Sequence, residues 1–182
     1  MACPYSINFL MHDINIKGFF KFCMAKLISE DEEIKSSLEL LLLKNKIQNK
    51  VAISWIPYKI ILQSGEKKSV YELDPKTKGA GDYVLALKPI NEIENLIDGI
   101  NNFLKDKDSK MFSFEPNEPS FELVIEKSHK GYSATCWADA GNVISNHYTW
   151  DGFGLRFFTT EKNLLSFVEE LSKEKEGLFN VC

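Results

Sequence analysis

An eight-residue pattern occurs twice in this chain, and this repeat constrains the fold more than any other feature. Ser37 to Lys44 reads SLELLLLK and Ser120 to Lys127 reads SFELVIEK, so Ser, Glu, Leu and Lys recur at matching places 83 positions apart. The segments VAISW and SATCW follow the two copies and end at Trp55 and Trp137, which are 82 positions apart. The sequence therefore predicts a structural unit that is built twice.

Each copy is followed by an amphipathic segment, at Glu92–Lys105 in the first half and at Glu161–Lys173 in the second. Apolar residues recur there at the i, i+3, i+4, i+7 spacing of a helix with one buried face. Short turns between the preceding extended runs favour antiparallel pairing. The expected fold is α+β, an antiparallel β-rich domain made of two similar β-β-β-α halves. The predicted buried stripes are Ile93, Leu96, Ile97, Ile100, Phe103 and Leu104, and Leu164, Phe167, Val168 and Leu171.

Polar connections set the expected divisions of the chain. Residues 29–108 form the first half, residues 109–182 the second, and residues 1–28 an N-terminal segment to which no role is assigned. A length of 182 residues suits one compact domain overall. Met24 offers an alternative start of the natural protein, with residues 1–23 as upstream reading; an ordinary N-terminal strand or helix is the competing interpretation.

The first copy of the repeat is ambiguous between helix and strand. Ser29 and Glu32 have the spacing of a capping box, which would begin a helix. The second copy instead alternates apolar and polar residues with the period of a strand, as in Phe121 and Leu123 against Glu122. If the halves match, Leu38 to Leu43 is a strand as well. The segment SKEKEGLFNVC near the end indicates a helix that stops at Gly177.

Composition excludes several functional classes. The net charge of −4 disfavours nucleic acid and anionic membranes as partners. No run reaches the roughly 18 apolar residues of a membrane span. The four cysteines, Cys3, Cys23, Cys136 and Cys182, are scattered without a CxxC pair, which indicates free thiols in a reducing compartment such as the cytoplasm.

No catalytic, cofactor or metal motif stands out. His12, His129 and His147 lack the spacing of a zinc site, and KGAGDY is not a phosphate-binding loop. We expect no cofactor and no enzymatic activity. An enzyme remains the least favoured reading and would need a pocket where Asp139, His147 and Asp151 converge.

Candidate partner-binding residues come from the acidic clusters and from one aromatic hairpin. Complementary charge would steer a basic protein partner to such carboxylates, although charge runs are usually solvated faces. An Asp-Gly turn at Asp151 predicts a hairpin between aromatic segments, whose default role is core packing. The predicted partner-binding residues are Asp31, Glu32, Glu33, Glu115, Glu118, Asp139, Trp150 and Asp151.

The second half resembles a known family. PSFELVIEK, YSATCWADAGN and GLRFFTTEKNLLSFVEEL, within about Phe112 to Leu171, are similar to the WapI-type immunity proteins of bacterial polymorphic and contact-dependent toxin systems. The resemblance implies a small β-rich cytoplasmic protein that binds a cognate toxin domain, such as a basic nuclease, and occludes it. It carries over no functional residue. A secretion chaperone or another protein-binding scaffold is the alternative function.

Overall fold

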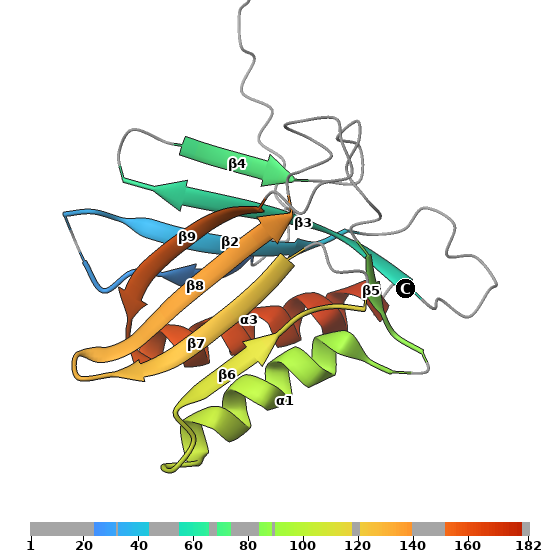
Figure 1. Cartoon of the computed structure of the whole chain (residues 1–182). Helices are drawn as coiled ribbons and strands as arrows, with labels where there is room; N and C mark the ends of the chain where they lie inside the picture. Colours follow the sequence, from blue (N-terminus) through green and yellow to red (C-terminus); the bar gives the residue numbers. More distant parts are fainter. Residues whose placement is uncertain are drawn as a thin grey trace, which may run out of the picture.

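The computed structural model describes residues 24–31, 33–43, 55–65, 69–73, 84–88, 90–117, 121–139 and 152–179. Within these ranges the chain forms two antiparallel sheets, each followed by a helix (Figure 1). This arrangement confirms the predicted α+β, antiparallel β-rich fold.

The first sheet has five strands and precedes helix α1. Its strands are β1 (Ala25–Ile28), β2 (Ser36–Leu42), β3 (Trp55–Ser64), β4 (Ser69–Leu73) and β5 (Val84–Ala86). Neighbours in the chain pair as β1-β2-β3-β4, and β5 pairs with the beginning of β3, at Trp55 to Pro57. Helix α1 then spans Glu92–Lys105, as the apolar spacing predicts.

The second sheet repeats this order. Its strands are β6 (Met111–Phe114), β7 (Phe121–Ser128), β8 (Gly131–Asp139) and β9 (Gly152–Thr159), and they pair as β6-β7-β8-β9. Helix α3 (Glu161–Phe179) follows directly. Each half is thus an antiparallel meander closed by a helix, although the first half carries the extra strand pairing at β5.

Residues 37–42 of the first copy lie in β2 and residues 121–127 of the second lie in β7, so the strand interpretation is confirmed for Leu38 to Leu42. The capping-box alternative is wrong, because Ser29 directly follows β1 and no described helix begins there, and its Oγ accepts a hydrogen bond from the backbone N–H of Ser36 (3.0 Å).

The correspondence between the two tryptophans is wrong in register. Leu40 pairs with Ile60 and its counterpart Leu123 pairs with Cys136, which places the following strands 76 positions apart. Trp55 and Trp137 are 82 positions apart. The tryptophans therefore stand six positions out of step in the two ladders. The connection between β2 and β3 is longer than the connection between β7 and β8. The strand that follows the repeat is therefore paired in a different register in each half.

One core joins the inner faces of both sheets to the two helices. Alternate residues of the repeat strands point inward and are buried, as strand periodicity requires. Tyr58 of the first sheet meets Phe121 of the second edge to face, with ring centroids 5.5 Å apart. The two helices lie side by side beneath the sheets (Figure 1) and are linked by Lys175 and Glu94 at 3.0 Å. The inward repeat residues are Leu38, Leu40 and Leu42, and Phe121, Leu123 and Ile125.

Helix α3 begins at Glu161 as predicted but continues beyond Lys173 to Phe179. The predicted stop at Gly177 is wrong. Leu178, one residue later, is buried in the core, and this apolar contact holds the last turn in helical form despite the low helix propensity of glycine. Helix α1 is capped by Asn91, whose side-chain oxygen accepts the N–H of Glu94 at 3.2 Å.

Helix α3 also ties the second half to the beginning of the first sheet. Glu174 accepts hydrogen bonds from the backbone N–H groups of Ala25 (2.7 Å) and Leu42 (3.0 Å), and Glu170 accepts one from Lys26 N–H (3.0 Å). At the other end of β1, Thr159 Oγ1 donates to the carbonyl of Ile28 at 2.7 Å. These contacts satisfy backbone N–H and C=O groups of β1 and of the end of β2.

Candidate functional site

The side of the second sheet that faces away from the helices is the best candidate for a functional surface. Strand periodicity sends Leu123, Cys136 and Leu155 inward, so their neighbours in the chain point outward. We call this surface the outer face. Its residues are Met111, Ser113, Glu122, Val124, Glu126, Ser133, Thr135, Trp137, Gly154, Arg156 and Phe158.

Three large apolar side chains of the outer face are open to solvent. Met111 is 56% exposed, Trp137 51% and Phe158 48%. The ladder places Phe158 opposite Ser133, Ser133 opposite Glu126, and Glu126 opposite Met111. Phe158 and Met111 therefore stand at the two ends of one row across the sheet, with two polar residues between them. Trp137 stands further along, between Glu122 and Gly154. The apolar groups thus surround a small and polar centre.

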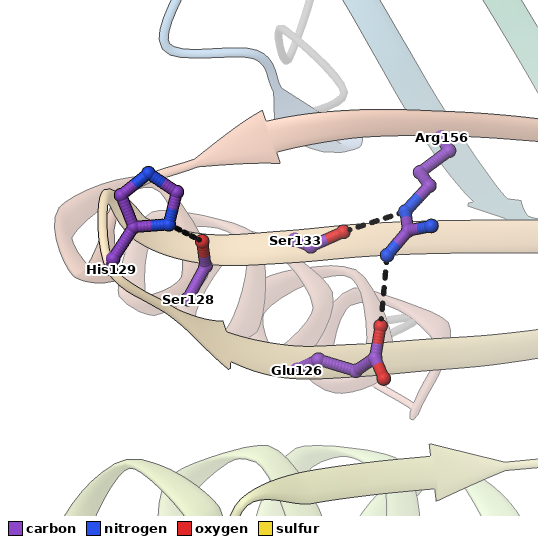
Figure 2. A network of polar contacts seen from close by, with 5 residues as sticks. All are labelled: Glu126, Ser128, His129, Ser133 and Arg156. Atoms are coloured by element: carbon purple, nitrogen blue, oxygen red, sulfur yellow. Dashed lines mark hydrogen bonds and ion pairs between the residues drawn. The ribbon is translucent and has the colours of Figure 1, made fainter.

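Arg156 crosses that centre and joins three strands (Figure 2). Its Nε donates to Ser133 Oγ at 3.0 Å, and its Nη2 lies 3.1 Å from Glu126 Oε2. Arg156 thus pairs with an acidic neighbour two strands away in the same sheet. Both charged side chains are well exposed, so the ion pair adds little to stability. The two contacts instead hold the Arg156 guanidinium group in a defined position on the outer face.

The indole of Trp137 occupies the space above Gly154, its partner across the β8–β9 ladder. A Cβ atom at Gly154 would lie 2.3 Å from Cε3 and 2.4 Å from Cζ3 of the indole. Any other residue at this position would therefore push the ring aside. Because Gly154 has no side chain, the exposed Trp137 indole can lie against the sheet surface.

Glu122, on the other side of Trp137, has no described counter-ion. Its Oε1 accepts a hydrogen bond from Ser113 Oγ at 3.0 Å, and no described Lys, Arg or His forms an ion pair with it. Beneath the face, burial and then the charge of Glu122 raise the pKa of the Cys136 thiol to about 12. Cys136 is a buried, protonated thiol and is unsuited to nucleophilic chemistry.

A second feature is a polar hollow of about 750 Å³ where β1, β2 and the start of α3 meet. Lys26 lines it but is held by Glu39 at 2.5 Å. Asp31 also lines it, and its carboxylate accepts the N–H groups of Glu33 (2.8 Å) and Ile34 (2.9 Å). Lys26 and Asp31 at this hollow thus serve local strand and turn contacts.

The predicted partner residues do not gather at one place. Asp31 and Glu33 belong to the β1–β2 turn, which meets the end of β9 through Glu30 N–H and the carbonyl of Phe158 at 2.8 Å. Glu115 is exposed and follows β6, at the opposite end of the second sheet. Asp139 ends β8 at that same end, and its side chain lies outside the described part. Glu32, Glu118, Trp150 and Asp151 also lie outside the described residues.

The expectation of core packing for the aromatic segments of the hairpin covers both Phe157 and Phe158, and the sequence did not single out Met111 or Trp137. Phe157 is buried, as that expectation requires, but Phe158 faces outward. Strand alternation carries the missing signal: the small residues Ala134, Cys136 and Ala138 mark the inner side of β8, so Trp137 between them must face outward. Glu122, which the alternation predicts on the opposite side from Phe121 and Leu123, lies on the outer face, and Glu126 lies there with it.

His129 lies in the exposed turn between β7 and β8, with its Nδ1 3.5 Å from Ser128 Oγ (Figure 2). The grouping of Asp139, His147 and Asp151 that an enzyme would require lies outside the described side chains.

Across the part of the chain that is described, no three His, Cys, Asp or Glu side chains come together as metal ligands. Neither described helix has the length and apolar character to cross a membrane. Comparison of the chain with protein-family models, with curated proteins and with solved structures gave no match.

Proposed function

We propose that this protein is a non-enzymatic immunity protein, which binds a cognate bacterial toxin domain in the cytoplasm and occludes it. The observation that carries the proposal is the outer face, where Trp137, Phe158 and Met111 stand exposed on a hydrogen-bonded sheet. Tryptophan and other large side chains dominate the binding energy of protein interfaces. Their placement on a sheet means that little conformational entropy is lost when a partner docks.

Electrostatics support a basic partner. The chain has a net charge of −4, and the positive charge of Arg156 is already balanced by Glu126. Glu122 therefore gives this face an excess of negative charge. Complementary charge raises the association rate of protein pairs, which suits an inhibitor that must reach its toxin before the toxin acts.

Co-expression tests the proposal. The neighbouring open reading frame is expressed in bacteria alone, with this protein, and with its Trp137→Ala variant. We expect growth arrest that the wild-type protein relieves and that the variant relieves less well. Trp55→Ala is the matched control, because Trp55 is 42% exposed but lies on the first sheet. Arrest without relief, and no complex on co-purification, would contradict the immunity function.

A further inference from the structure

We propose that Trp137 and Glu122 together form the receptor for one cationic side chain, arginine or lysine, of the basic protein partner. The inference rests on the proposed function, because it names the chemical group through which the partner engages the outer face. It concerns one corner of that face, the corner where β7 begins and β8 ends.

The two residues have complementary roles in holding a cation. They are direct partners in the β7–β8 ladder, so their Cβ atoms are about 5 Å apart and both side chains rise from the same face. Tryptophan is the aromatic residue that attracts cations most strongly through its ring face. A carboxylate beside it can accept charge-assisted hydrogen bonds from the same cation. A guanidinium or ammonium group placed there would contact both.

The charge on this corner is not balanced by the described chain. Glu126, the other carboxylate of β7 on this face, is paired with Arg156, whereas Glu122 receives only the hydroxyl of Ser113. Glu115 follows the last β6–β7 pair, Phe114 with Leu123, and adds an exposed carboxylate at the same end of the two strands. A cation from outside is therefore the complementary occupant.

The geometry of Trp137 is fixed in advance. The benzene ring of the indole fits above Gly154, so the side chain is held against β9 while half of its surface stays open. A preorganised aromatic group loses little rotamer freedom when a ligand binds. Gly154 is thus a positioning residue for this site.

Solution NMR tests the site with a defined probe, the capped pentapeptide Gly-Arg-Gly-Arg-Gly. We expect saturable shifts of the Trp137 indole N–H and of the Glu122 and Gly154 amides at peptide concentrations up to about 10 mM, which detects binding worth roughly 3 kcal/mol. The same peptide with citrulline in place of arginine has no charge and should bind at least about fivefold more weakly.

Three variants separate this site from general charge attraction. Glu122→Gln and Gly154→Ala should each weaken arginine-peptide binding by about fivefold or more, the first by removing the charge and the second by displacing the indole. Glu169→Gln is the matched control, because Glu169 is an exposed carboxylate on α3 paired with Lys173, and it should bind like wild type. Amide spectra of each variant confirm that it is folded.

Equal binding of the citrulline peptide, an unchanged affinity in Glu122→Gln, or no shift at the Trp137 indole would each overturn the inference. The outcome is distinct from that of the growth experiment. Peptide binding without growth relief would refute the immunity function and leave the cation site standing. Growth relief by the wild-type protein, together with no binding of the arginine peptide to that same wild-type protein, would refute the site and leave the function standing.

Discussion

The indole of Trp137 lies over the backbone of Gly154, its neighbour across the β8–β9 ladder, so closely that a Cβ atom there would come within 2.3 Å of the ring. An aromatic residue that covers a cross-strand glycine shields the exposed sheet backbone. In this protein the same contact determines how an exposed tryptophan is presented on the outer face.

Gly154→Ala should therefore lift the indole away from the sheet. Because Trp137 is half exposed, the ring has room to move, and we expect the protein to stay folded with a loss of no more than about 1 kcal/mol of stability. Tryptophan fluorescence should shift to longer wavelength. The Trp137→Phe background identifies the residue responsible, since the shift must vanish there. An unchanged spectrum in Gly154→Ala would show that the indole does not rest on the glycine.

Two glycines in the helices should respond to alanine with opposite signs. Gly99 in α1 faces Phe112, and a Cβ there would lie 2.3 Å from Cε2 of that ring. Gly177 in α3 has no atom within 4 Å of the same position. Gly177→Ala should stabilise the protein by up to about 1 kcal/mol through helix propensity. Gly99→Ala should destabilise it by about 1–2 kcal/mol, because the Phe112 ring must move away from its packing against Gly99 and Phe103 of α1.

Urea unfolding of the two variants measures this difference directly. The substitution is chemically identical at both sites, so propensity alone would make both stabilising. Equal stabilisation would mean that the contact between Gly99 and Phe112 is not tight in solution.

Protonation of Glu174 should make the free energy of unfolding depend on pH, over the range between the pKa values of this carboxyl in the unfolded and folded states. Burial raises the pKa of this carboxyl to about 7, with the charge of Glu170 acting in the same direction, against the opposing N–H donors of Leu42 and Ala25. The ordinary value is 4.5. Between these values the folded state binds the proton more strongly than the unfolded state does. The contribution of Glu174 is therefore fully present below 4.5 and is lost as the pH rises through 7.

Glu174→Gln removes this titration. Urea unfolding from pH 4.5 to 8 measures the free energy of unfolding of wild type and variant. As the pH rises, the wild-type protein should lose stability relative to the variant. A flat difference for Glu174→Gln, or one of opposite slope, would contradict the assignment.

Cys136 should resist alkylation in the folded protein. Its thiol is buried and its pKa is raised to about 12, so the reactive thiolate is scarce at neutral pH. Mass spectrometry after iodoacetamide treatment should find Cys136 unmodified in buffer and modified in urea. Rapid labelling of Cys136 without denaturant would show that β8 opens readily.

Periodicity predicted most of the fold because it reflects burial directly. The spacing of Ile93, Leu96, Ile97 and Ile100 fits a helix with one buried face, and it predicted the bounds of α1. Alternation in Phe121 to Lys127 identified a strand, and the repeat transferred that assignment to Leu38 to Leu43. The end of α3 was missed because Gly177 is a common stop signal, whereas the buried contact of Leu178 is a tertiary effect.

The candidate site was less predictable than the fold. Whether an aromatic residue lies inside or outside depends on the register of its strand, and a shift of one position exchanges the two faces. The sequence therefore gave Phe157 and Phe158 the same role, although they lie on opposite sides of the sheet. The contact between Trp137 and Gly154 depends on the pairing of strands separated by residues 140–151, which no local pattern determines.

The affinity of the protein for the proposed toxin partner, the product of the neighbouring open reading frame, tests the central claim most directly. Isothermal titration calorimetry with the purified toxin domain would compare wild type with Trp137→Ala and Phe158→Ala. Each substitution removes an exposed side chain of the outer face and should weaken binding by about tenfold or more. Trp55→Ala and Leu165→Ala are the matched controls, since these side chains are 42% and 46% exposed elsewhere on the molecule, and they should bind like wild type. Unchanged affinity in both outer-face variants, or an equal loss in the controls, would contradict the account.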